Sequence, residues 1–239
     1  MRNTWIRDIK QDESYKNKVK TVFVLAAESS EGEALKQMIS EWNLHKDILL
    51  IDLKDNLFMH AQKVLGFMEY FTQNCEQEEI TKSLSGPKVQ SKQKFPLLAK
   101  VTDDVIIFPD NLIKVLQSIS NSQETFFSGG IYIFAGHFAS GSGYILSYQA
   151  VKEIFEFARC LNAVMYQDDV VFTGDLRERL GIAKMHFNFR DNCDHWTSVE
   201  FNSQTILKKS TLIHKTPGFS TQQQIEIYQV GMGKKNTNA

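Results

Sequence analysis

The sequence predicts an α/β fold in which helices flank a mostly parallel sheet. Residues 21–26 (TVFVLA) and 47–53 form β-rich apolar runs, the pattern of strands that are buried on both faces of a parallel sheet. Elsewhere, apolar residues recur at positions i, i+3, i+4 and i+7, the spacing of one face of a helix. Strands that alternate with helices in this way are typical of α/β domains.

The helices are predicted from that spacing and from the residues at their ends. Pro109 suits the first turn of a helix, and Gly181 suits the position just after a last turn. The expected helices span residues 31–43, 57–74, 109–120, 149–161 and 168–180. The remaining β-rich stretches are expected over residues 95–101, 126–135 (broken by Gly129-Gly130) and 212–214.

The length of 239 residues allows one large domain or two small ones. Residues 75–94 are rich in Glu, Lys, Gln and Ser and contain Gly86-Pro87, which predicts a solvated loop rather than a domain boundary. We therefore expect a single catalytic domain over residues 1–230, followed by a polar tail over residues 231–239.

The charge balance and the hydropathy exclude several classes of protein. Lys and Arg number 27 against 28 Asp and Glu, so the net charge of −1 gives no reason to expect binding to nucleic acid or to an anionic membrane. A hydrophobic fraction of 42% indicates an ordinary globular core. The apolar runs fall far below the ~18 residues of a membrane span, and residues 1–5 lack the apolar region of a signal peptide.

Two adjacent carboxylates, Asp103 and Asp104, directly follow the strand expected at residues 95–101. Ligands of parallel sheets lie beyond the carboxyl ends of the strands, so this is the first place to look for chemistry. The repulsion within the pair would be offset either by a divalent cation, which prefers oxygen ligands, or by solvent exposure. Because side chains alternate along a strand, Thr102 and Asp104 are expected to point one way and Asp103 the other.

A second acidic pair, a glycine motif and a histidine are further candidates. Asp168 and Asp169 either complement a helix dipole or supply a general base. Gly141-Ser142-Gly143 does not fit the G-x-G-x-x-G nucleotide motif, because Leu146 stands at the third glycine; its glycines indicate a tight turn or a close backbone approach. His214 lies on a short apolar run and is either a core or edge histidine or a ligand.

Seven short motifs occur in order over most of residues 2–214. They include Arg2-Asn3-Thr4-Trp5, Lys100-Val101-Thr102-Asp103-Asp104-Val105, Ala139-Ser140-Gly141-Ser142-Gly143-Tyr144-Ile145-Leu146-Ser147, Asp168-Asp169-Val170 with Gly174, and Leu212-Ile213-His214. In that order they resemble R-x-T-W, K-x-D-D-D-V, Y-x-S-G-x-G-Y-V-L-S, E-D-V-x-x-G and I-x-H of one enzyme family. The sequence thus resembles the β1,3-galactosyltransferases and β1,3-N-acetylglucosaminyltransferases, type II Golgi enzymes with a GT-A fold.

The resemblance implies an inverting hexosyltransferase. Such an enzyme would move galactose or N-acetylglucosamine from UDP-galactose or UDP-N-acetylglucosamine to a glycan acceptor on a glycoprotein or glycolipid, in β1,3 linkage. Mn²⁺ would bridge the donor diphosphate and a strand-end carboxylate, and an acidic residue would deprotonate the acceptor hydroxyl. The family's location is the Golgi lumen, where a membrane anchor that this sequence lacks would hold it.

Carried over by position, the family's roles fall on a small set of residues. Asp104 and His214 correspond to the metal ligands. Asp169, or less favourably Asp168, corresponds to the catalytic base. The residues implied in donor or cofactor binding are Asp103, Asp104, Gly141, Gly143 and Tyr144.

Three departures from the family pattern support an alternative, a catalytically weak or inactive glycosyltransferase-like binding protein. Thr102 stands where the first Asp of D-D-D is expected, and a neutral hydroxyl is a poorer Mn²⁺ ligand than a carboxylate. The connection over residues 127–138 is shorter than the family's, and Asp175 replaces an expected Cys. The family's tail, anchor and stem would precede residue 2, so we expect a luminal fragment, an incomplete gene model or a divergent relative.

Overall fold

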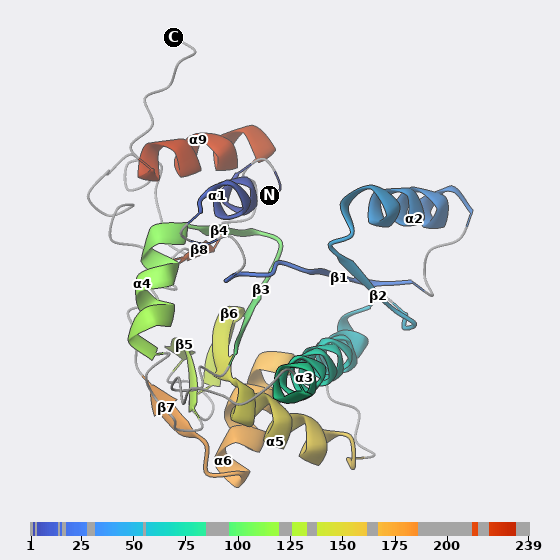
Figure 1. Ribbon diagram of the computed structural model, residues 1–239, viewed down its shortest axis with the longest axis vertical. Coiled ribbons are helices and arrows are strands. Elements are labelled where there is room, and N and C mark those ends of the chain that lie inside the picture. The colour runs from blue at the N-terminus through green and yellow to red at the C-terminus, as the bar shows by residue number, and fades with distance from the viewer. Residues whose placement is uncertain are drawn as a thin grey trace.

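The computed structural model of the chain combines helices with short strands (Figure 1). The residues that it describes are 2, 4–13, 15, 18–27, 32–54, 56–84, 96–119, 126–132, 138–161, 167–185, 212–214 and 220–232.

Within these residues the strands form three sheets. β1 (Phe23–Ala26) and β2 (Ile48–Ile51) pair in parallel. β4 (Val105–Ile107) and β8 (Leu212–His214) pair antiparallel. The largest sheet has the strand order β3-β6-β5-β7. Its strands are β3 (Leu97–Val101), β5 (Phe126–Tyr132), β6 (Phe138–Ser147) and β7 (Ala183–Met185).

The predicted α/β class is confirmed, but the expectation of a mostly parallel sheet is wrong for the described strands. β3 and β5 both pair antiparallel with β6, and parallel pairing is confined to β1–β2 and β5–β7. An apolar run indicates that a strand is buried, and it leaves the strand's direction open. Only residues 133–137 join β5 to β6, and a link that short suits antiparallel neighbours, because parallel ones need a crossover of about a dozen residues.

The predicted helices are confirmed with shifted ends. In chain order the helical segments are α1 (Trp5–Gln11), α2 (Glu33–His45), η1 (Leu57–Met59, a 3₁₀ turn), α3 (His60–Leu84), α4 (Pro109–Ile119), α5 (Tyr148–Ala158), η2 (Asp169–Leu176, π-helical), α6 (Arg177–Arg179) and α9 (Thr221–Gly231). Gly181 has φ +67° and follows α6, as its predicted C-cap role requires. Among these helices, none combines the length and the apolar character that crossing a membrane requires.

The loop predicted over residues 75–94 is wrong for its first half, because α3 continues to Leu84. The Glu, Gln and Lys residues that suggested a solvated loop are also good helix formers, so they extend the helix at its exposed end. The second half, residues 85–94, lies outside the described residues. The strand β4 and the helices α1 and α9 carry no expectation from the sequence pattern.

β6 lies between two hydrophobic clusters. One contains Ile145 together with residues of α1, β4, α4 and α9, and the other contains Tyr144 and Leu146 together with residues of α3, α5 and η2. Successive residues of a strand point to opposite faces, so neighbouring β6 side chains enter different clusters. α9 lies beside α1 in Figure 1, where the Tyr228 hydroxyl donates a 2.6 Å hydrogen bond to Asp8. The two ends of the chain therefore close the first cluster together.

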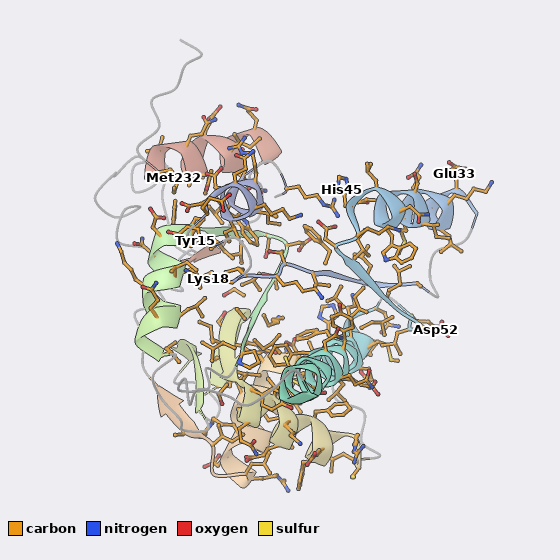
Figure 2. All side chains as sticks on the ribbon, viewed as in Figure 1. Tyr15, Lys18, Glu33, His45, Asp52 and Met232 are labelled. Carbon is orange, nitrogen blue, oxygen red and sulfur yellow. The ribbon has the colours of Figure 1, made fainter. Side chains whose placement is uncertain are left out.

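α2 stands away from both clusters (Figure 1), and its side chains between Glu33 and His45 fan out from the rest of the molecule (Figure 2). None of its residues is buried. Ile39, Trp42 and Leu44 are exposed, the last at 76%. The apolar spacing that predicts this helix therefore does not mark a face buried in this chain.

The N-terminal segment is held to the β1–β2 unit by ion pairs. The Arg2 guanidinium donates two hydrogen bonds to the carboxylate of Asp47, at 2.8 and 3.2 Å. It also pairs with Glu41 and lies 4.4 Å from the ring centroid of Phe23. Lys10 Nζ adds a second cation 3.2 Å from Asp47. The hydrogen bonds from Arg2 hold the pKa of Asp47 below its usual value, although burial opposes the shift.

We expect Asp47→Ala to lower the free energy of unfolding by about 2–3 kcal/mol at pH 7, because two cations lose a shared, charged hydrogen-bond acceptor. The folded-state pKa of Asp47 is depressed, so its contribution is present above the unfolded pKa of about 3.9 and is lost as the pH falls through the folded value. Urea unfolding of both proteins at pH 7 and at successively lower pH measures the difference. It should shrink on acidification, and the exposed Asp52→Ala should show no comparable loss.

Candidate active site

The candidate site is built on one face of the β3–β6 pair. Lys100 lies directly opposite Tyr144, and Val101 lies opposite Gly143. Opposed residues of an antiparallel pair share a face, so Lys100 and Tyr144 lie side by side, with Nζ 5.5 Å from the ring centroid. The backbone N–H of Thr102 continues the contact by donating to the carbonyl of Ser142 at 3.1 Å.

Asp168 is buried against this face. Its Oδ2 accepts a 3.0 Å hydrogen bond from the buried Tyr144 hydroxyl and lies 3.2 Å from Lys100 Nζ. Lys100 Nζ also donates to the carbonyl of Gly141 at 2.6 Å. Burial raises the pKa of Tyr144, and the charge and hydrogen bond of Asp168 raise it further, so this phenol stays a donor at neutral pH.

Asp169 is more accessible and begins the π-helical segment η2. Its Oδ1 accepts a 2.9 Å hydrogen bond from the N–H of Val170, and its Oδ2 faces Gly141. Burial is the largest cause that raises the pKa of Asp169; Asp168 raises it further, whereas the Val170 N–H, Lys100 and the Gly141 N–H oppose the shift. Single π-helical turns are frequent at functional sites. A half-buried carboxylate with a raised pKa, set at the edge of a strand, has the properties of a general base.

Two residues of η2 and α6 fix the position of Asp169. The Thr173 hydroxyl accepts a 2.8 Å hydrogen bond from the N–H of Ala139 on β6 and donates to the carbonyl of Asp169. The buried Arg177 donates to the carbonyls of Thr173 and Ile182, at 3.0 and 3.3 Å. The backbone that carries Asp169 is therefore tied directly to β6.

Asp104 lies in the turn between β3 and β4. Its Oδ1 accepts a hydrogen bond from the hydroxyl of Thr102, so these two side chains point to the same side, as predicted. Val105, the next residue, pairs with His214 in the antiparallel β4–β8 ladder. The side chain of His214 lies outside what the structure describes, but its backbone is placed one residue from Asp104. Asp103 is exposed.

The structure thus brings Tyr144, Gly141, Asp168 and Asp169 into one cluster. The two glycines do not form a tight turn, because residues 141–143 lie inside β6. The other expectation, close approach, is confirmed at Gly141, where a Cβ would lie 3.0 Å from Oδ2 of Asp169. Gly143 pairs with Val101 on the same stretch of β6.

Three residues of this cluster were not among the sequence candidates, namely Lys100, Thr173 and Arg177. Lys100 had a visible signal, because it is a charged residue within the otherwise apolar run FPLLAKV and is rarely buried without a partner. Thr173 and Arg177 carry no such signal, since their roles depend on the π-helical geometry of η2. In the described part of the chain, no group of three or more His, Cys, Asp or Glu side chains forms a preassembled metal cage.

Comparisons with known proteins agree with the resemblance seen in the sequence. The family model for galactosyltransferases matches residues 1–83. Over 216 residues the chain is 21% identical to the β-1,3-galactosyltransferase bre-2 of Caenorhabditis elegans, an alignment that covers 79% of this chain and 55% of that protein. The predicted resemblance to β1,3-galactosyltransferases is therefore confirmed. The chain spans about half the length of the curated relative that it matches.

We expect Gly141→Ala to lower the free energy of unfolding by about 1–3 kcal/mol, because the new methyl group would press on the Asp169 carboxylate. A double-mutant cycle with Asp169→Ala isolates that contact. Removing the carboxylate should make Gly141→Ala nearly neutral, as judged by urea unfolding of all four proteins. An equal cost in both backgrounds would show that the methyl group meets something other than Asp169.

Proposed function

We propose that the protein is an inverting glycosyltransferase that moves galactose or N-acetylglucosamine from a UDP-sugar to a glycan hydroxyl in β1,3 linkage. The single observation that carries the proposal is a chain of contacts between the two acidic pairs. It runs from Asp104 through Thr102 to Ser142, and the adjacent Gly141 faces Asp169. A candidate donor-binding carboxylate and a candidate base thus lie at the same end of the β3–β6 pair. The sequence similarity to a β-1,3-galactosyltransferase supports the reaction class.

The residues present fit a divalent cation of the Mn²⁺ type. Carboxylate oxygens suit Mn²⁺, and imidazole also binds first-row metals. Asp104 supplies the former, and the backbone of His214, which lies across the ladder from Val105, places an imidazole-bearing residue next to it. Asp104 and His214 would hold the ion. When bound, such an ion offsets the negative charge that develops on the departing diphosphate.

Asp169 is the proposed general base. It accepts the proton of the acceptor hydroxyl as that oxygen bonds to the anomeric carbon, and the bond from that carbon to UDP breaks on the opposite side. Attack opposite the leaving group inverts the anomeric centre. The raised pKa of Asp169 brings its basicity closer to neutral pH, which favours proton transfer during the attack.

Asp168 is less suited to that role. Its Oδ2 already accepts from Tyr144 and pairs with Lys100, and the carboxylate is buried. A base must lie within hydrogen-bond reach of the proton it removes. Asp169, at the more accessible position, meets that requirement more readily. Gly141, Gly143 and Tyr144 form the stretch of β6 beside it, and we propose that they shape the wall near donor and acceptor.

A catalytically weak, glycan- or nucleotide-sugar-binding protein is the second candidate. The observation that favours it is the Thr102–Asp104 hydrogen bond, in which a hydroxyl stands where the resembling family has a carboxylate and occupies one oxygen of Asp104. Turnover separates the two candidates. By the same resemblance we propose that the donor is UDP-galactose or UDP-N-acetylglucosamine, that the acceptor lies on a glycoprotein or glycolipid, and that the protein acts in the Golgi.

The first experiment is a calorimetric titration of UDP into the protein with and without Mn²⁺. We expect binding that requires the metal, and we expect Asp104→Ala to weaken it at least tenfold, because the cation loses its carboxylate ligand. Asp175→Ala, an exposed carboxylate on η2, serves as the matched control and should bind like wild type. Unchanged binding by a folded Asp104→Ala protein would refute the metal assignment.

We expect Asp169→Asn to retain metal-dependent UDP binding and to lose at least 10²-fold in transfer rate, because the amide cannot accept the proton. Product formation with each UDP-sugar and a panel of glycan acceptors gives the rate. Asp175→Asn is again the control. Full transfer by Asp169→Asn would move the base to another residue, and Asp168→Asn would be assayed next.

A further inference from the structure

Lys100 is a buried cation that joins the two elements flanking Asp169. Its Nζ donates to the carbonyl of Gly141 on β6 at 2.6 Å and lies 3.2 Å from Oδ2 of Asp168, the residue just before η2. Its side chain is only 13% exposed. We propose that Lys100 is a positioning residue that clamps Asp168 to Gly141 and thereby holds the Asp169 carboxylate in place for proton transfer. This inference rests on the proposed function for its catalytic meaning, but its structural part is testable without turnover.

The clamp follows from where the contacts of Lys100 lie along the chain. Asp168 immediately precedes Asp169, and Gly141 is the residue that the Asp169 carboxylate faces. A single ammonium group therefore holds the backbone on one side of the carboxylate and the anchoring aspartate on the other. Loss of either contact would let η2 shift relative to β6, which is the movement that changes the position of Asp169.

The charges point the same way. Asp168 and Asp169 are adjacent carboxylates, and the charge of Asp168 raises the pKa of Asp169 whereas that of Lys100 lowers it. A buried carboxylate also needs a cation to offset its lost hydration. The groups that face Asp169 are thus Lys100 and Asp168, with the Tyr144 hydroxyl bound to Asp168 behind them. Lys100 balances the pair so that the more accessible carboxylate can serve as base.

Lys100 is already committed to protein contacts. An ammonium group has three N–H donors. One is used by Gly141, one by Asp168, and the group lies 5.5 Å from the centroid of the Tyr144 ring, within the range of a cation–π contact. This arrangement favours a positioning role over a direct contact to the phosphates of a donor, which would need a free, more exposed ammonium.

The test compares Lys100→Met and Lys100→Arg in the full 239-residue chain, with the exposed Lys114→Met on α4 as the matched control. The carboxyl ¹³C shift of Asp169, assigned by its loss in Asp169→Asn, is followed against pH. We expect the midpoint of Asp169 to move to higher pH in Lys100→Met, because a neutral side chain no longer opposes the charge of Asp168. It should stay near the wild-type value in Lys100→Arg and in Lys114→Met.

Asp168→Asn is the second variant, and the expected shift has the opposite sign. The amide keeps the shape and can still accept from Tyr144, but it removes the neighbouring negative charge while Lys100 stays. The Asp169 midpoint should therefore move to lower pH. This variant decides the question if Lys100→Met does not fold. An unchanged Asp169 titration in whichever of the two variants folds would overturn the clamp.

Activity provides the second readout. With wild-type turnover in hand, Lys100→Met should lower kcat at least tenfold while the KM for the UDP-sugar stays within twofold, and the acid limb of the kcat profile should move to higher pH. Lys100→Arg should recover part of kcat. A tenfold rise in KM with unchanged kcat would instead make Lys100 a donor ligand and overturn the proposal. If the wild type transfers no sugar, the proposed function fails, and the titration of Asp169 still decides whether Lys100 positions it.

Discussion

The position of β6 is the constraint on which the candidate site depends. This strand pairs with β3 on one side and β5 on the other, and both of its faces are buried over residues 144–147. A shift in its register by one residue would move Tyr144 and Ile145 to each other's cluster, which is costly because both faces are packed. The register is therefore strongly fixed. Lys100, Gly141 and Tyr144 take their positions from it.

The two carboxylates beside β6 differ because of their surroundings. Asp168 is buried and accepts from Tyr144 and Lys100, whereas Asp169 is more accessible and bound mainly by backbone N–H groups. Two groups of the same chemical type thereby acquire separate roles, one that organises the site and one that is available to a substrate. The sequence shows the pair but not this division, because adjacent aspartates look alike until the neighbours of each are known.

Local patterns predicted the fold better than the site. The 3.6-residue spacing located α4 and α5, and Gly181 marked the end of α6, because these features depend on nearby residues. Strand direction was mispredicted, since it depends on which distant strands pair. The acidic pairs and Gly141 were identified from residue type and family resemblance. The contact of Lys100 with Gly141 joins residues far apart in the chain, and no local spacing encodes it.

The two halves of the site are supported unequally. Around Asp169, Thr173 and Arg177 fasten η2 and Lys100 bridges it to β6, all through buried or nearly buried side chains. Asp104 rests on a turn between β3 and β4, where Thr102 binds one of its oxygens and a short β8 lies alongside. The Thr102 departure from the family pattern falls in this less braced half. A loss of metal affinity there would leave the geometry around Asp169 unchanged, because no contact described for Asp169 passes through the Asp104 side chain. Weak donor binding and an intact base can therefore coexist in one protein.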